Sequence, residues 1–425
     1  PNFLAENSEV TAPVVFAGFG ITAPELHDDD YASIDARGKI VLMFSGAPET
    51  FPTDQRAFYS NGHWKDENAA KHGAAGVITM LTPIDEQRAP FEKRAQQTGI
   101  PPMLYLDDNG RPADAIEGIR GAAMVNQATA QRLRDGAHTV TMRTVSQFTE
   151  AKSENVIGLL RGTLDEAVVV SAHLDHIGNH PHPSGDSIYN GAYDNASGIA
   201  CLIEIARTLA SSPKPNRSIL FVAFTGEEKG DQGSQYFARH LPRPVVADVN
   251  MDMFLMLYPV ADLVPLGGEH STLGEMAAEA AKGAFAISPD PFPEEVRFIR
   301  SDQFSFVEQG IPAIHLKPGN KSLDPAIDGA KVTRDWLRTV YHSPQDDMSQ
   351  HFDFDSGARY ATVNARLVSM IANAPEPPKW KPGDFFAPVE SGRPGGSRQT
   401  SRPATSAAAR DAQPLPARRP LSPWK

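Results

Sequence analysis

The stretch FVAFTGEEKGDQGS, residues 221–234, joins a buried strand to a pair of charges. Its apolar start and its glycines are typical of a core strand that ends in a turn. Glu227 and Glu228 follow the strand directly. Adjacent carboxylates repel one another unless a positive charge lies beside them. The stretch therefore predicts that other parts of the chain bring positive charge to this strand end.

The region around this stretch alternates between strand and helix patterns. EAVVVSAHLDH, RSILFVAFTG, VVADVNMDMF and GIPAIHL are predicted strands, and SGIACLIEIARTLASS, SQYFARHL, STLGEMAAEAAKGAF and DSGARYATVNARLVSMIANA are predicted helices. Strands that are apolar on both faces and alternate with helices predict a doubly wound α/β sheet. In such sheets the functional residues collect at the carboxyl ends of the strands.

Three regions differ in pattern. Residues 10–146 predict a small β-rich module with short helices, in which Gly18 and Gly20 form a turn rather than a nucleotide loop. Residues 147–374 contain the alternating pattern. Residues 375–425 are rich in Pro, Arg, Ser and Ala, and they predict a disordered or loosely packed tail.

Composition excludes several classes of protein. The formal charge of -12 disfavours a nucleic-acid partner, and no apolar run approaches the length of a membrane span. The single cysteine, Cys201, lies in an apolar helical pattern and predicts a core residue, so neither a disulfide framework nor a cysteine-built metal site is expected. The chain starts at Pro1 without a signal peptide, and we interpret it as processed or trimmed.

Acidic and imidazole side chains recur where the predicted strands end. Two residues apart on a strand, His173 and Asp175 point to the same side, and the spacing suits an imidazole ligand with a carboxylate beside it. The full set of strand-end and loop donors is His173, Asp175, Asp194, Glu227, Glu228, Asp252 and His342. Zinc accepts such a mixture of His and carboxylate ligands, and a cluster of carboxylates requires cations.

The order of these motifs resembles peptidase family M28, the dizinc aminopeptidases and glutamate carboxypeptidase relatives. The matching motifs are AHLDH, YNGAYDNASG, FTGEEKG, NMDM, RSDQFSFVEQGIPA and YHSPQDD, and no HExxH helix is present. VVFAGFGITAPELHDDDYASIDARGKIVLMFSG and AAKHGAAGVI resemble the protease-associated (PA) domain that many members carry as an insertion. Members with this layout usually have further residues before the PA domain, which complete the catalytic domain.

The resemblance implies two Zn²⁺ ions per chain and a role for each residue. Asp194 would bridge both ions, Glu228 and His342 would complete one site, and His173 and Asp252 the other. Glu227 would be the general base and Asp175 would hold the His173 ring. The resemblance also implies a cis peptide after Asp194.

Several residues near these motifs have weaker assignments. Many relatives carry His or Tyr where this chain has Gln303, which could help to bind the oxyanion through its amide. Arg300 is a candidate substrate or oxyanion contact, with a structural ion pair as the alternative. His176, His180 and His182 are expected at the rim of the site, and His315 could face the pocket or not. Asp346 and Asp347 could support His342 or cap a turn.

The predicted function is a zinc-dependent exopeptidase that acts on peptides or dipeptides, most simply an aminopeptidase. Three alternatives remain: a dipeptidase or carboxypeptidase of the same family, a glutaminyl cyclase with one zinc, and a receptor-like binding protein. The complete ligand set favours a two-metal peptidase over the last two. Resemblance alone places the protein outside the cell or in the periplasm. The sequence leaves its residue specificity and oligomeric state open.

Overall fold

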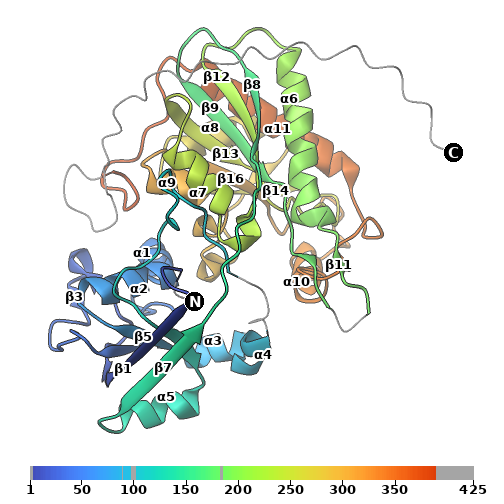
Figure 1. The fold of residues 1–425 in the computed structure, drawn as a ribbon. Helices are drawn as coiled ribbons and strands as arrows, with labels where there is room; N and C mark the ends of the chain where they lie inside the picture. The colour runs from blue at the N-terminus through green and yellow to red at the C-terminus, as the bar shows by residue number, and fades with distance from the viewer. Residues whose placement is uncertain (1–2, 89, 97–101, 182–184, 389–425) are drawn as a thin grey trace. The chain divides into compact units, whose positions relative to one another are not determined.

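A seven-stranded mixed sheet contains the strands whose ends carry the predicted donors (Figure 1). The computed structural model describes residues 3–88, 90–96, 102–181 and 185–388. The strands of this sheet are β8 (Val156–Leu160), β9 (Ala167–His173), β12 (Ser218–Phe224), β13 (Val245–Asn250), β14 (Asp262–Leu266), β15 (Ala286–Ile287) and β16 (Ala313–Pro318). The helices around it are α6 (Ser197–Ala210), α7 (Gln232–Arg239), α8 (Leu273–Ala281), α9 (Gln303–Glu308), α10 (Gly329–Thr339) and α11 (Phe354–Asn373).

The strand order is β15-β14-β16-β13-β9-β12-β8, and its four middle strands are parallel. β8 and β14 pair antiparallel with β12 and β16. In register, His173 at the end of β9 pairs with Phe224 at the end of β12, and Asn250 on β13 pairs with His315 on β16. The carboxyl ends of these four strands therefore meet at one edge of the sheet.

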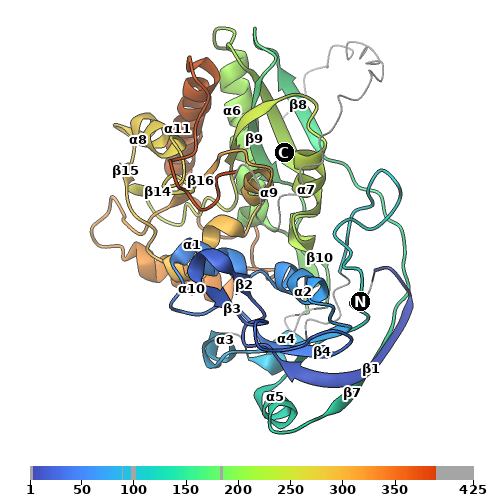
Figure 2. The same cartoon turned by 90° about the vertical axis from the view of Figure 1, so that its left-hand side faces the viewer.

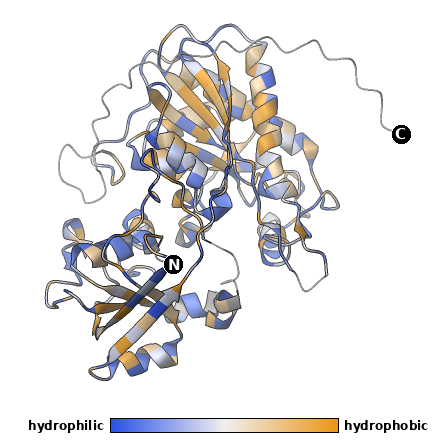
Figure 3. Ribbon diagram, in the orientation of Figure 1, coloured by the Kyte–Doolittle hydropathy of each residue, from blue (hydrophilic) through white to orange (hydrophobic). Residues whose placement is uncertain are grey.

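Both faces of the sheet are buried, which confirms the doubly wound α/β class. Val168 and Val170 on β9 pack into the apolar cluster that contains residues of α6, α8 and α11. Val169 lies in the opposite cluster, with residues of α7 and α9. Figure 3 shows the central strands as predominantly apolar. Burial on both faces explains why β9 reads as a continuous apolar run, and Cys201 of α6 is buried in this core, as predicted.

The N-terminal region forms a five-stranded sheet in the order β6-β5-β4-β1-β7. The strands are β1 (Asn7–Phe16), β4 (Ile40–Phe44), β5 (Gly76–Met80), β6 (Ala122–Val125) and β7 (Thr139–Val145), and Figure 2 shows β1 and β7 side by side. The helices are α1 (Thr53–Tyr59), α2 (Gly62–Lys71), α3 (Pro83–Arg88), α4 (Phe91–Gln96) and α5 (Gln127–Arg134). Gly18 and Gly20 have positive φ angles of 47° and 73°, as the predicted turn requires.

Two-residue strands complete the structure: β2 (Thr22–Ala23) pairs with β3 (Asp28–Asp29), and β10 (Gly178–Asn179) with β11 (Ile188–Tyr189). None of the helices in the described ranges has the length and apolar character that a bilayer span needs.

The ordered chain continues past residue 375, where the tail was expected to begin. Trp380 donates its indole N–H to the carbonyl of Gly310, and Phe385 is buried. Aromatic and apolar contacts thus hold residues 375–387 to the rest of the compact unit Pro1–Ala387. The remainder of the predicted tail, residues 389–425, lies outside the described residues.

Candidate metal centre

Three strand ends bring the predicted donors together at the carboxyl edge of the large sheet. His173 is the last residue of β9, and Asp252 lies two residues after β13. Glu227 and Glu228 follow β12 in a short 3-10 helix, Glu227–Lys229, that begins after Gly226. Gly226 has a φ of 71°, which an L side chain rarely adopts, so glycine is needed to turn the chain at this point.

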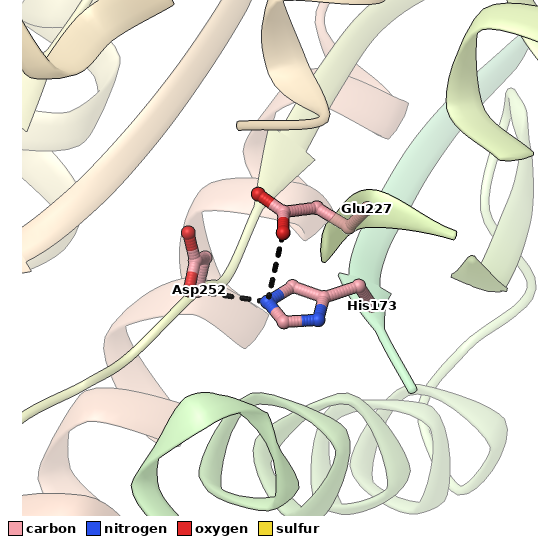
Figure 4. A group of neighbouring side chains, drawn as sticks. All are labelled: His173, Glu227 and Asp252. Atoms are coloured by element: carbon pink, nitrogen blue, oxygen red, sulfur yellow. Dashed lines mark hydrogen bonds and ion pairs between the residues drawn. The ribbon is translucent and has the colours of Figure 1, made fainter. Parts of the chain in front are cut away.

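The first donor group surrounds the imidazole of His173 (Figure 4). Its Nε2 lies 3.4 Å from Asp252 Oδ1 and 4.0 Å from Glu227 Oε2. The same nitrogen lies 3.3 Å from Asp194 Oδ1. Donor atoms that bind one tetrahedral zinc at about 2.0–2.2 Å lie roughly 3.3–3.6 Å apart. Each of the two aspartate oxygens therefore lies at the distance from the His173 nitrogen that two ligands of one zinc ion have.

The second donor group uses the other oxygen of Asp194. His342 Nε2 lies 3.1 Å from Asp194 Oδ2 and 3.2 Å from Glu228 Oε2. Asp194 thus directs Oδ1 to the first group and Oδ2 to the second, as a carboxylate that bridges two ions does. The structure brings together all five residues that the resemblance names as ligands.

Backbone hydrogen bonds hold Asp194 in place. Asp346 is fully buried, and its carboxylate accepts from the N–H of Tyr193 at 2.8 Å and of Asp194 at 3.0 Å. The peptide between Asp194 and Asn195 is cis, as the resemblance implies. The Asn195 side chain then bonds the carbonyl of Met251, next to Asp252. Asp346 therefore supports the bridging aspartate rather than His342, whereas Asp347 accepts from Ser349 N and closes a turn.

Asp175 has a different set of contacts from the one expected. The Nδ1 of His173 bonds the backbone carbonyl of Asp175 at 3.1 Å, while the nearest carboxylate oxygen is 4.0 Å away. The carboxylate instead accepts from the backbone N–H groups of Glu227 and Glu228, at 3.2 and 3.3 Å. One residue thus orients both the imidazole and the turn that carries the two glutamates.

Burial and neighbouring groups shift the pKa values of several side chains in this centre. Burial by itself lowers the pKa of His342, but hydrogen bonds to Asp194 and Glu228 outweigh it and raise this pKa to about 9. Burial raises the pKa of Glu227 well above its ordinary value. Burial would also raise the pKa of Glu228, but hydrogen bonds to His176 and His342 outweigh it and lower this pKa. Adjacent glutamates thus differ in proton affinity. The donor atoms of His173, Glu227 and Asp252 lie within 4.8 Å of one another, and so do those of His176, Asp194 and Glu228, so this cluster of carboxylates and imidazoles fits divalent cations.

His176 lies deeper in the site than the rim position expected for it. Its Nδ1 is 2.8 Å from Glu228 Oε1 and 3.7 Å from Asp194 Oδ2. The bond to Glu228 leaves Oε2 of that residue facing His342. The spacing HLDH, which repeats an imidazole three residues after His173, was the available signal. His180 is partly exposed and lies beside Tyr189, and His182 lies outside the described residues.

Of the residues with weaker assignments, two are buried in the core and one is exposed. Gln303 is fully buried, and its amide donates to the carbonyl of Phe298 and accepts from Asn250, both at 2.6 Å. Gln303 therefore bonds core groups at both its amide oxygen and its amide nitrogen, which does not support the expected contact with an oxyanion. His315 is buried behind Asp252, with Nε2 3.0 Å from its carbonyl oxygen. Arg300 is exposed and forms no ion pair with any described residue.

Two known proteins align with most of the length of this chain. Aminopeptidase YwaD of Bacillus subtilis is 28% identical over 355 residues, which cover 81% of this chain and 63% of the relative. The probable lipoprotein aminopeptidase LpqL of Mycobacterium tuberculosis is 25% identical over 362 residues, with 81% and 64% covered. The chain therefore spans somewhat less than two thirds of these relatives.

A solved aminopeptidase from Aneurinibacillus sp. strain AM-1 is 22% identical, with a TM-score of 0.47 and coverage of 90% of this chain and 78% of that one. The model of peptidase family M28 matches residues 155–368, about half of the chain, which include every donor of both groups. The chain belongs to peptidase family M28.

Proposed function

We propose that this chain is a zinc-dependent exopeptidase of the aminopeptidase type that binds two zinc ions. The observation that carries the proposal is the sharing of Asp194 between two His–carboxylate groups. Membership of family M28 and the names of two relatives as aminopeptidases support it. Asp194, Glu228 and His342 would hold one ion, and Asp194, His173 and Asp252 the other.

Zinc ions at this centre would lower the pKa of a bound water and polarise the scissile carbonyl. Glu227 supplies the proton transfer. Its carboxylate borders the first donor group but is not needed as a ligand, and burial raises its pKa above the ordinary value of a glutamate. Glu227 would take a proton from the attacking water and return it to the leaving amine.

Other side chains would bind the substrate and orient the base. Asp175 fixes the backbone of Glu227 through the hydrogen bond described above. Arg300, which is exposed and unpaired among the described residues, is a proposed substrate contact. The family resemblance further implies that the substrate's free amine binds at the metals, which would confine cleavage to the first peptide bond.

The test is product analysis with the zinc-loaded chain. A tetrapeptide with a free N-terminus should lose residues one at a time from that end, with or without a C-terminal amide. The acetylated peptide should remain intact. Release from the carboxyl end would instead identify a carboxypeptidase, and ammonia loss from an N-terminal Gln would identify a cyclase. A chain that binds zinc and cleaves none of a broad panel would be a binding protein.

We also propose the domain division that the sequence predicts. Residues 10–146, which hold the five-stranded sheet, would be a PA domain, and residues 147–374 the catalytic domain. We propose an exported protein, because one relative is named a lipoprotein aminopeptidase. Fractionation of cells that express the whole gene would test this location.

A further inference from the structure

The two adjacent glutamates lie in a short segment between β12 and α7. This segment spans residues 225–231, and we call it the glutamate turn. Gly226 and Gly230 flank its single 3-10 turn, with φ angles of 71° and 89°. Because glycine restricts the backbone less than any other residue, the glutamate turn has little stiffness of its own. The direction of the Glu227 side chain therefore depends on contacts that hold the turn from outside.

Gln232, the first residue of α7, holds the glutamate turn through its side chain. Its Nε2 donates to the carbonyl of Gly230 at 2.8 Å and to that of Lys229 at 3.3 Å. Its backbone N–H donates to the carbonyl of Gly226 at 2.9 Å. Asp175 bonds N–H groups of the same turn. Gln232 and Asp175 thus hold the turn by opposite ends of its peptide groups.

The oxygen of the Gln232 amide contacts the N-terminal region. It accepts from the backbone N–H of Tyr105 at 2.8 Å, and Tyr105 begins the loop of residues 105–114, which we call the N-terminal loop. The Tyr105 ring meets the ring of Tyr236 on α7 edge-on, with centroids 5.5 Å apart. Asp114 pairs with Arg239 at the end of α7, at 2.9 Å. The N-terminal loop is therefore fastened along α7, and Gln232 joins that loop to the glutamate turn.

The two glutamates differ in how far they depend on this connection. Glu228 is held by its side chain, through His176 and His342. The carboxylate of Glu227 approaches His173 only to 4.0 Å, so its position follows that of its backbone. A displacement of about 1 Å at a reacting group can cost roughly 100-fold in rate. A looser glutamate turn should therefore affect the proposed base more than the proposed metal ligand.

We propose that Gln232 is a positioning residue for Glu227, through which the N-terminal loop fixes the glutamate turn. The inference rests on the proposed peptidase function and adds a dependence to it. Proton transfer by Glu227 would require that the N-terminal region stays in contact with α7. Gln232 itself touches the backbone of the turn and acts on the reaction only through it.

The kinetic test compares wild type with Gln232→Met as zinc-loaded full-length chains, with an N-terminal leucyl amide as substrate. Methionine keeps the length of the side chain and removes both ends of the amide. We expect Gln232→Met to lower kcat about 10–100-fold, with zinc content unchanged and a change in KM below about threefold. This division between kcat and KM distinguishes a misplaced base from a lost substrate contact.

Gln235→Met is the matched control. Gln235 lies on the same helix and also donates to the carbonyl of Gly230, at 3.1 Å, but it has no hydrogen bond to the N-terminal loop within the described ranges. Its kcat should stay within about twofold of wild type. Equal losses in the two variants, or no loss in Gln232→Met, would overturn the proposal. If a thermal melt shows that Gln232→Met is unfolded, Gln232→Glu replaces it, because glutamate loses the donors to the turn.

Hydrogen exchange separates this inference from the proposed function, because it requires no turnover. Peptides that cover residues 225–233 should exchange about tenfold faster in Gln232→Met than in wild type, whereas Gln235→Met should match wild type. Peptides of β9 should be unchanged in both variants, which shows that the fold is retained. If wild type cleaves nothing and this difference is found, the connection stands and the peptidase proposal fails.

Tyr105→Pro tests the other end of the connection, because proline lacks the N–H that Gln232 accepts. It should speed exchange of the glutamate turn in the wild-type background and add little in the Gln232→Met background, since residues in one hydrogen-bond network do not act additively. Unchanged exchange in Gln232→Met, or equal effects of Tyr105→Pro in both backgrounds, would overturn the connection and leave the peptidase assignment intact.

Discussion

Glu227 and Glu228 are neighbours with the same side chain, and their surroundings separate their roles. Glu228 contacts His342 and His176, whereas Glu227 has only a 4.0 Å approach to His173. Glu227→Gln should therefore lower kcat by about 10²–10⁴-fold while two zinc ions remain bound, since a general base contributes about that much. Steady-state kinetics and metal analysis of the same sample check this.

Glu228→Gln is the matched comparison for that substitution. It should weaken zinc binding, because it removes a charged oxygen from the group around His342. Equal zinc loss in the two variants would contradict the division of roles between the adjacent glutamates.

His176 is expected to act on metal affinity through Glu228. Its Nδ1 bonds the glutamate oxygen that does not face His342, and it thereby fixes the orientation of that carboxylate. His176→Ala should weaken one of the two zinc sites about 10–100-fold, as loss of a partner of a metal ligand does. Competition with a chromophoric chelator measures this, and His180→Ala, in the exposed hairpin nearby, should leave both affinities unchanged.

At the scale of elements, the turn before α6 depends on one acid from a distant loop. Asp346→Ala would leave the N–H groups of Tyr193 and Asp194 without their acceptor in a buried place. We expect the free energy of unfolding to fall by about 2–4 kcal/mol, and zinc affinity with it. Urea denaturation measures the first effect. Asp347→Asn, at an exposed turn, should cost less than about 1 kcal/mol.

Lys65 of helix α2 should make the free energy of unfolding depend on pH. Lys65 is 2% exposed, donates to the carbonyls of Phe44 and Gly46, and has its pKa lowered by burial to about 8. Because its unfolded pKa is near 10.5, the unfolded state binds the extra proton between about pH 8 and 10.5. Stability should therefore rise with pH across that window.

The rise should amount to roughly 2–4 kcal/mol, since one pKa unit corresponds to about 1.4 kcal/mol. Lys65→Met lacks this titration, so the difference in unfolding free energy between wild type and variant isolates it from other groups. Urea denaturation at pH 8 and pH 10 measures the difference. A constant difference at both values would contradict the lowered pKa.

For the whole molecule, metal removal should show how much bound ions contribute to stability by joining several strand ends. Donors from β9, the turn after β12, the segment after β13, and the loop residues Asp194 and His342 meet there. Chelation should lower Tm by roughly 5–10 °C, because ions that bind only the folded state stabilise it. Two equivalents of zinc should restore it, and full recovery with one would contradict a shared two-ion site.

The local pattern of the sequence predicts many of the strands of this protein. Apolar runs such as residues 167–172 predicted the buried parallel strands, and the motifs around His173, Asp194, Glu227 and His342 named the donors. The strands follow from residue order and period, since a strand that is buried on both faces is predominantly apolar. The pattern of the sequence therefore predicts the coarse fold, whereas the ligand set was implied by the resemblance to family M28.

Only the tertiary structure decided which distant groups meet. Asp346 bonds the backbone of Asp194, His176 bonds Glu228, and Gln303 turns into the core. Such contacts join residues tens to hundreds of positions apart, and their directions depend on strand register and side-chain packing. A one-dimensional pattern contains neither, so it identifies the donors of a site but not the groups that hold, orient and complement them.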